Sequence, residues 1–142
     1  MKNEGYTVTI AISNTPAEVF NCIGNVSKWW SKDFEGSSAK LNDEFVIFHP
    51  GAHYSKQKLV EVIPNNRVVW LVTGSKLDWL EKNKSEWTNT KMVFKITTEG
   101  DKTVLHFTHE GLVPELECYY RCGQGWNMVI KQRLFNFITM GK

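Results

Sequence analysis

The four histidines are the residues whose chemistry would be easiest to use, because imidazole changes charge near neutral pH and also binds metal ions. His49 and His53 flank a Pro-Gly turn, where they could share a metal ion or pass a proton. No carboxylate or cysteine stands beside them at ligand spacing. A hairpin turn is therefore the better interpretation of this histidine pair.

His106 and His109 lie on opposite faces of one predicted strand, so only one of them can point inward. His109 shares its face with Leu105 and Phe107, which are apolar. We expect His109 to hydrogen-bond at the end of this strand and to hold the turn that follows. The alternative is that it serves as a polar group in a cavity.

The remaining reactive side chains do not form a catalytic set. Glu44, Glu61 and Glu110 lie in predicted strands, and one that faced an apolar interior could act as an acid or base, but strand carboxylates usually face water. Cys118 and Cys122 are four residues apart and could hold a soft metal, although buried packing thiols are the simpler interpretation. The sequence predicts no catalytic residue, no metal site and no cofactor.

Length and charge limit the class of protein. The 142 residues are 42% hydrophobic, which fits one domain over residues 1–142. A net charge of +2 without a basic run argues against a nucleic-acid binder. The chain shows neither the roughly 18-residue apolar run of a membrane span nor the apolar core of a signal peptide. We expect a cytoplasmic monomer or homodimer with reduced thiols.

The longest predicted element is an amphipathic helix over residues 115–140, between Pro114 and Gly141. A 3.6-residue period places its apolar residues on one arc, which consists of Leu116, Tyr119, Tyr120, Gly123, Trp126, Ile130, Leu134, Phe137 and Ile138. Gly123 and Gly125 each cost about 1 kcal/mol in a helix relative to alanine. They indicate a close approach by a neighbouring group or a ligand.

Alternating and capped patterns predict the other elements. Residues 6–12 are expected to form a strand, followed by a short helix at 17–23 and a second helical piece at 26–30. An antiparallel meander follows from residue 34 to 110, with hairpin turns at 49–51, 64–66 and 99–101. The predicted fold class is α+β, with a sheet of about six or seven strands against the C-terminal helix.

Two Trp-rich features are expected at an opening of the fold. Trp29 and Trp30 are adjacent in the second helical piece and cannot both face inward there, so one should face a groove or a cavity mouth. Residues 74–89 break the strand pattern and carry charged side chains around two indoles. Trp79, Leu80 and Trp87 should keep this segment attached, so we expect a mobile flap.

Several segments carry a family resemblance: the first strand followed by NTPAEVF, then KWW, KLVEVIPNNRVVWLV, TVLHFTHEGL and a final GW pair. In this order they resemble the START-like, or SRPBCC, superfamily, and in particular its branch related to the activator of heat-shock ATPase homologue. The resemblance implies a helix-grip fold, in which a curved antiparallel sheet surrounds a C-terminal helix and encloses a cavity. It does not imply one activity, because the superfamily includes carriers, cyclases and co-chaperone domains.

An aromatic content of 13% favours a cavity for an apolar guest. We expect its lining to be Trp30, Phe45, Trp70, Phe94, Phe107, His109, Tyr120 and Trp126, with His109 or Tyr120 as the polar group. The predicted function is the binding of a small hydrophobic or amphipathic ligand, such as a lipid. The alternatives are a co-chaperone or protein-interaction module and, with less support, a polyketide-cyclase-like enzyme.

Overall fold

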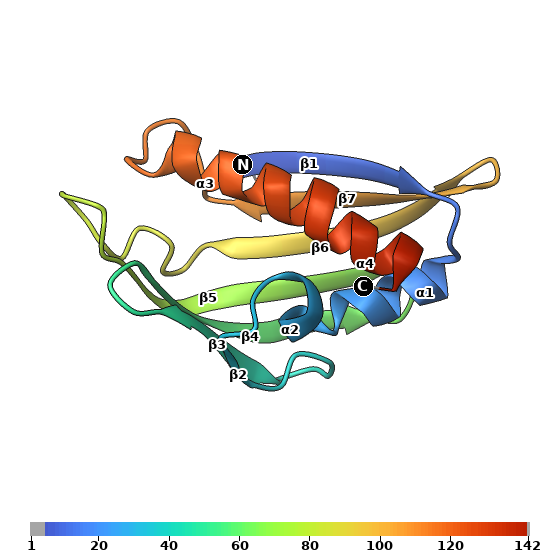
Figure 1. Cartoon of the computed structure of the whole chain (residues 1–142), viewed down its shortest axis with the longest axis horizontal. Helices are drawn as coiled ribbons and strands as arrows, with labels where there is room; N and C mark the ends of the chain where they lie inside the picture. The colour runs from blue at the N-terminus through green and yellow to red at the C-terminus, as the bar shows by residue number, and fades with distance from the viewer. Residues whose placement is uncertain (1–4, 142) are drawn as a thin grey trace.

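The computed structural model describes residues 5–141, which form a seven-stranded antiparallel sheet crossed by a long C-terminal helix (Figure 1). The strands are β1 (Gly5–Ile12), β2 (Phe34–Gly36), β3 (Glu44–His49), β4 (His53–Ile63), β5 (Arg67–Leu77), β6 (Lys91–Glu99) and β7 (Lys102–Glu110). Their order is β1-β7-β6-β5-β4-β3-β2. The predicted meander is therefore confirmed, and β1 and β2 are the edges of the sheet.

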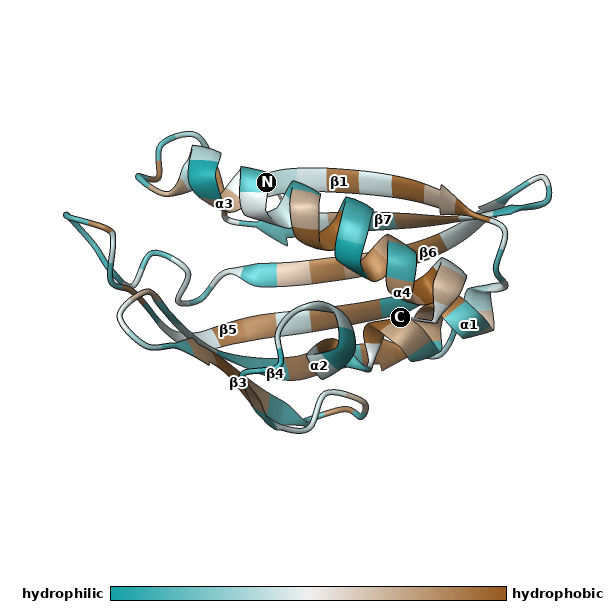
Figure 2. Cartoon of the chain, viewed as in Figure 1, coloured by the Kyte–Doolittle hydropathy of each residue, from teal (hydrophilic) through white to brown (hydrophobic). Residues whose placement is uncertain are grey.

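One face of the sheet carries the helices and the core. Along β1, Val8, Ile10 and Ile12 are buried while the residues between them are exposed. Figure 2 shows this alternation of apolar and polar residues along β1 and polar residues on the visible side of the C-terminal helix. The two short helices, α1 (Pro16–Ile23) and α2 (Val26–Trp29), lie on the same side as the long helix (Figure 1).

The start of α1 follows from its sequence. The Thr15 hydroxyl accepts a hydrogen bond from the Glu18 amide, and the Glu18 carboxylate accepts one from the Thr15 amide. Such a reciprocal capping box satisfies two backbone donors that would otherwise be unpaired. Pro16 occupies the first turn, as predicted.

The C-terminal helix begins four residues later than predicted. It consists of α3 (Tyr119–Met128), a π-helical stretch η1 (Val129–Leu134) and α4 (Phe135–Met140). Residues 111–118 form turns instead of the first helical turns that we expected from residue 115. Gly141 ends the helix at φ 72° in the left-handed conformation, which glycine adopts without strain.

The apolar face of this helix also differs from the predicted arc. Tyr120 is 76% exposed, whereas Cys122 and Val129, which the arc omitted, are buried. The predicted arc applied one 3.6-residue period to the whole segment. Residues 115–118 are not helical, however, and residues 129–134 are π-helical, so neither stretch follows that period. A π-helical stretch changes the angle between successive residues and so shifts the buried face.

Trp29 and Trp30 are both buried, which corrects the expectation that only one could face inward. The helix α2 has only four residues and ends at Trp29, so Trp30 already lies where the chain leaves the helix. Both indoles stack near Trp70, with ring centroids 6.1 and 5.9 Å from it. Trp30 also lines a cavity, which agrees with the expectation that one of the two indoles faces a groove or a cavity mouth.

The Trp-rich excursion is shorter than predicted. Residues 74–77 continue β5 to Leu77, and the irregular loop covers residues 78–90. Leu80 and Trp87 are buried within the core, and Trp79 packs against it. The three attachment points of the loop are therefore confirmed, while its first four residues belong to the sheet.

Candidate functional site

A cavity of about 170 Å³, partly open to solvent, lies between the sheet and the C-terminal helix. Its lining comes from the residue that follows α2, from β4, from the 78–90 loop and from the C-terminal helix. The lining residues are Trp30, His53, Trp87, Cys122, Gly125, Trp126 and Val129. Three of these residues are tryptophans. The cavity therefore offers broad apolar ring surfaces with one imidazole and one thiol.

The three indoles form a continuous wall. The ring centroid of Trp126 lies 5.1 Å from that of Trp30 and 5.9 Å from that of Trp87, and the Trp87 ring is nearly parallel to it at 14°. All three side chains are at least nine-tenths buried. Aromatic surfaces held in this way favour a flat apolar guest, which can stack or make edge contacts.

The two glycines of α3 have different reasons to be glycine. A side-chain carbon on Gly123 would lie 2.6 Å from the Tyr6 ring, so this position lets β1 and the helix come together. A carbon on Gly125 would meet nothing within 4 Å. Since Gly125 also lines the cavity, its missing side chain leaves part of the cavity empty.

His109 lies behind the indole wall and fixes its position. The Trp126 Nε1–H donates to His109 Nδ1 at 3.0 Å, so the proton of the neutral ring is on Nε2 and donates to the Thr90 hydroxyl at 2.8 Å. Thr90 in turn donates to the carbonyl of Trp87. Complete burial lowers the pKa of His109 to about 3, so the ring is neutral at physiological pH.

Because both nitrogens of His109 bind protein groups, this residue has no atom left for a guest. The predicted role of holding the strand end fits its contacts, and its backbone carbonyl also accepts the amide of Leu112 at 3.1 Å. The expectation that His109 or Tyr120 is the polar group of the cavity is wrong for both residues. Tyr120 points to solvent on the outer side of the helix.

His53, which the sequence reading assigned to a turn, is the imidazole that lines the cavity. Its Nε2 lies 2.8 Å from the Ser55 hydroxyl, and Gln57 Nε2 donates to the same hydroxyl at 2.6 Å. Burial first, and then the neighbouring His49, lowers the pKa of His53 to about 4. The alternating polar residues at positions 53, 55 and 57 were the sequence signal that could have identified this inward-facing polar row.

The predicted aromatic lining residues other than Tyr120 lie either at the cavity surface or in the core behind it. Trp30 and Trp126 line the cavity. The remaining aromatic rings are buried behind its walls, where Phe107 lies 4.5 Å from Trp126 and Trp70 lies 5.9 Å from Trp30. This second layer consists of Phe45, Trp70, Phe94 and Phe107. It fills the core and supports the wall.

The predicted carboxylates face away from the cavity. Glu44 is exposed and pairs with Lys56 at 3.0 Å, and Glu61 pairs with Arg67 at 3.0 Å. Such partly exposed ion pairs contribute little to stability. No carboxylate from residues 5–141 is among those that line the cavity.

The thiols of Cys118 and Cys122 are buried one helical turn apart. A hydrogen bond that Cys118 donates to Cys122, together with burial, raises the pKa of Cys118, so this thiol keeps its proton. Within the described part of the chain, no group of three or more His, Cys, Asp or Glu side chains is placed to hold a metal ion. The two thiols pack between the loop and the helix.

Two glutamates attach the 78–90 loop to the segment before α3. The Glu86 carboxylate accepts hydrogen bonds from the amides of Glu117 and Cys118 at 3.0 and 3.1 Å. The Glu117 carboxylate accepts from the amides of Glu81 and Lys82 at 3.1 Å, and these bonds lower its pKa. The loop that carries Trp87 is thus held by a reciprocal pair of carboxylates.

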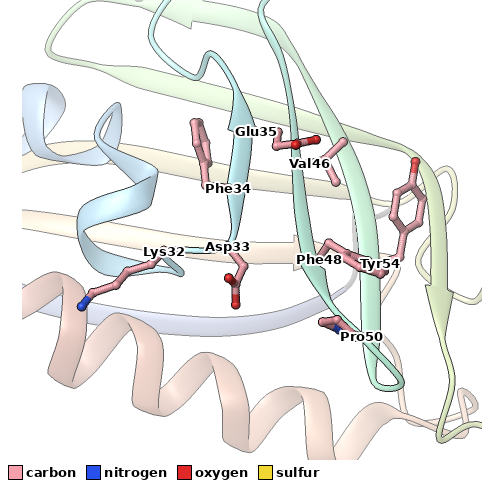
Figure 3. Close-up of a pocket in the computed structure, with 8 residues that line it drawn as sticks. All are labelled: Lys32, Asp33, Phe34, Glu35, Val46, Phe48, Pro50 and Tyr54. Atoms are coloured by element: carbon pink, nitrogen blue, oxygen red, sulfur yellow. The ribbon is translucent and has the colours of Figure 1, made fainter.

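A larger groove of about 610 Å³ lies on the opposite face of the sheet, near its β2–β3 edge (Figure 3). Its lining comes from the start of β2, from β3 and its turn, and from β4: Lys32, Asp33, Phe34, Glu35, Val46, Phe48, Pro50 and Tyr54. Three of these side chains are charged, and Phe48 is 49% exposed. This groove resembles a surface for a macromolecule more than a site for an apolar small molecule.

A curved antiparallel sheet that holds a C-terminal helix over an interior cavity defines the helix-grip, or START-like, class of proteins. Sequence comparison adds the family within this class. The chain belongs to the family described as "Activator of Hsp90 ATPase homolog 1-like protein", whose model matches residues 14–136. The resemblance noted in the sequence is therefore confirmed.

Solved structures share the fold at low sequence identity. The Aha1 dimer from Colwellia psychrerythraea has a TM-score of 0.75 at 20% identity, over 98% of both chains. DynU16, from the dynemicin biosynthetic locus, has a TM-score of 0.70 at 13% identity, over 99% of this chain and 49% of its own. MLL2253 from Mesorhizobium loti has a TM-score of 0.69 at 16% identity, over 90% and 93%. These similarities establish the fold alone.

A comparison with curated proteins finds no matching relative. Among residues 5–141, none of the helices is both long enough and apolar enough to cross a membrane.

Proposed function

We propose that this protein binds a small, uncharged aromatic molecule in the cavity between the sheet and the C-terminal helix. The observation that carries the proposal is the indole wall of Trp30, Trp87 and Trp126 facing the open space at Gly125. The three tryptophans keep a small part of their ring surface exposed in this partly open cavity, and a guest would remove that apolar surface from water.

The volume of the cavity narrows the class of guest. Sites for drug-sized molecules have about 300–1,000 Å³, whereas an apolar cavity of about 150 Å³ is enough to bind benzene. A cavity of about 170 Å³ therefore suits one ring with a small substituent, or two fused rings. We accordingly narrow the expected ligand from a lipid to a compact aromatic molecule.

The test is to fill the cavity from Gly125. Gly125→Leu places a branched side chain in the open space, and we expect it to weaken the binding of naphthalene or indole by at least about ten-fold, measured by calorimetry and tryptophan fluorescence. Gln124→Leu is the matched control, because Gln124 is the exposed neighbour of Gly125. Its affinity should equal that of the wild-type protein.

Two results would contradict the cavity function. One is the absence of any change in fluorescence or melting temperature with a panel of one- and two-ring aromatics. The other is equal affinity of Gly125→Leu and wild type. A fatty acid serves as the oversized probe and should bind more weakly than naphthalene.

A second candidate function is an interaction with a protein partner, in line with the family description as an activator of Hsp90 ATPase. The specific observation is the exposed Phe48, which lies 6.4 Å from Tyr54 between ring centroids in the groove of Figure 3. If a heat-shock ATPase docks there, the wild-type protein should increase its rate of ATP hydrolysis, and Phe48→Ser should abolish this increase. Unchanged stimulation would remove this candidate.

The remaining parts of the proposal concern the setting of the binding site. We propose one domain over residues 1–142, a cytoplasmic location and binding without turnover or cofactor. The Colwellia psychrerythraea relative is described as a dimer, which supports a homodimer as one of the two expected states.

A further inference from the structure

We propose that His53 is the hydrogen-bonding group of the cavity, held by Ser55 and Gln57 in the tautomer that donates from Nδ1, so that the cavity selects aromatic guests that carry a hydrogen-bond acceptor. This inference rests on the proposed function, and it concerns the specificity of the same cavity.

His53, Ser55 and Gln57 alternate along β4, and alternate residues of a strand point to the same face. This is the inner face of the sheet, because Ser55 and Gln57 are completely buried and His53 lines the cavity. Together they form a row of polar groups that leads from the cavity into the core.

The hydrogen bonds of this row determine where its protons lie. Gln57 Nε2 donates to the Ser55 oxygen at 2.6 Å, and an amide nitrogen cannot accept a hydrogen bond in return. A hydroxyl oxygen can accept two hydrogen bonds, but Ser55 is completely buried and its own proton has no other acceptor among the described residues. This proton therefore points to His53 Nε2, at 2.8 Å. Since Nε2 accepts this proton, the ring proton of neutral His53 resides on Nδ1.

Among the described residues, His53 Nδ1 has no hydrogen-bond partner, and it is not one of the polar atoms sealed from contact. The imidazole stands nearly perpendicular to Trp87 at 80°, with centroids 5.1 Å apart, and to Trp30 at 74°. A donor is thus available beside two walls of the aromatic cavity.

The tautomer of His53 depends on the orientation of the buried amide of Gln57. Its Oε1 is buried without a hydrogen-bond partner, and such an atom carries an energetic cost. If the amide turned over, Oε1 would accept from Ser55, His53 would donate from Nε2, and Nδ1 would become an acceptor. The orientation of one internal amide therefore decides whether the cavity presents a donor or an acceptor.

The His53 ring is uncharged, and this suits a neutral guest. The low pKa of His53 keeps the imidazole uncharged at neutral pH. His49, opposite it on β3, contributes to that low pKa, and the thiol of Cys122 is the other titratable group that lines the cavity. His49 itself pairs with Asp33 at 3.0 Å, outside the cavity. A carboxylate guest would gain no ion pair, whereas a ring nitrogen or a carbonyl would gain a hydrogen bond.

Three probes of similar shape test the inference: naphthalene has no hydrogen-bonding group, quinoline has only an acceptor, and indole has only a ring N–H donor. The wild-type protein should bind quinoline about three- to ten-fold more tightly than naphthalene, as expected for one net hydrogen bond, and indole should show no such gain. Equal binding of all three, or a preference for indole, would overturn the inference and leave the cavity function intact. No binding by any of the three would overturn the cavity function.

The role of Gln57 is tested with Gln57→Met, which keeps a similar volume but cannot donate to Ser55. The preference for quinoline should fall below about two-fold, while the control Gln124→Met, at an exposed helix position, keeps it. Nitrogen-15 NMR of wild-type His53 reads the tautomer directly, whether or not the variant folds. A proton on Nδ1 is the expected result, and a proton on Nε2 would overturn the inference.

Discussion

At the scale of single residues, the wall of the site depends on a chain of hydrogen bonds that no guest touches. His109 accepts from Trp126 and donates to Thr90, which donates to the backbone of the loop at Trp87. Each polar atom of this chain is satisfied within a buried region, where an unpaired group would be costly. Two of the three indoles are thereby held in place by one neutral imidazole.

Trp126 is central to this arrangement, because it lines the cavity and also donates a hydrogen bond to His109. Its ring is 3% exposed and contacts Phe107, and Trp126→Ala should lower the free energy of unfolding by about 3–5 kcal/mol. Trp126→Phe keeps a ring but removes the donor to His109, and we expect a smaller loss of about 1–3 kcal/mol. Denaturant unfolding measures both values. A midpoint of Trp126→Ala near that of wild type would contradict the packing of the helix on the sheet.

At the scale of secondary-structure elements, the 78–90 loop combines buried anchors with an exposed backbone. Trp87 and Leu80 fix it to the core, while residues 81–85 are exposed. Its contact with the segment before α3 consists of the reciprocal hydrogen bonds of Glu86 and Glu117. Such a loop can open locally without unfolding of the sheet.

We therefore expect the amides of residues 81–85 to exchange with solvent faster than those of β5 and β6. Glu117→Ala should accelerate exchange at Glu81 and Lys82, because it removes the acceptor of both amides. Glu115→Ala is the control, since Glu115 is exposed and forms no hydrogen bond or ion pair among the described residues. Hydrogen exchange detected by mass spectrometry decides the matter. Protection of the loop equal to that of the strands would count against a flap.

The elements differ in how well the sequence predicted them. The hairpins were predictable because alternating residues and the turn residues at 64–66 and 99–101 act locally. The start of α1 was predictable for the same reason, because its capping residues are neighbours in the sequence. The buried face of the C-terminal helix was not, because η1 changes the helical period in a way that depends on tertiary packing. Tyr120 was misplaced for this reason.

The candidate site was predictable only in part. Aromatic content pointed to a cavity, and Trp30 and Trp126, two of the residues expected at a ligand site, line the cavity of the structure. His53 was missed because a histidine next to a turn resembles a surface residue until the strand pairing places Ser55 and Gln57 behind it. Which rings fill the core and which ones face empty space depends on packing, and it left no periodic signal in the sequence.

At the scale of the whole molecule, buried neutral histidines make stability depend on pH. His109 has a pKa of about 3 in the folded protein, against about 6.5 for histidine in an unfolded chain. Between these values the unfolded state binds more protons, so stability is fully present above about pH 6.5 and falls as the pH drops toward 3. His53, with a pKa of about 4, acts in the same direction.

We expect the free energy of unfolding to fall by about 1.4 kcal/mol per pH unit for His109 alone between roughly pH 6 and pH 4. His109→Gln removes the titrating group and should flatten this part of the profile. His106→Gln is the control, because His106 is only half-buried and its ring contacts Thr97. Chemical denaturation at a series of pH values measures the slopes. An unchanged slope in His109→Gln would show that other groups cause the acid sensitivity.

The indole wall also has an optical consequence. Electronic transitions of neighbouring chromophores mix when the rings are close and held at fixed angles, and Trp30, Trp87 and Trp126 lie 5.1–6.5 Å apart between centroids. The near-ultraviolet circular dichroism of this protein should therefore contain a coupled band that a set of isolated tryptophans would not produce. A guest placed among the rings would change that band, so occupancy of the cavity can be followed by circular dichroism without any added label.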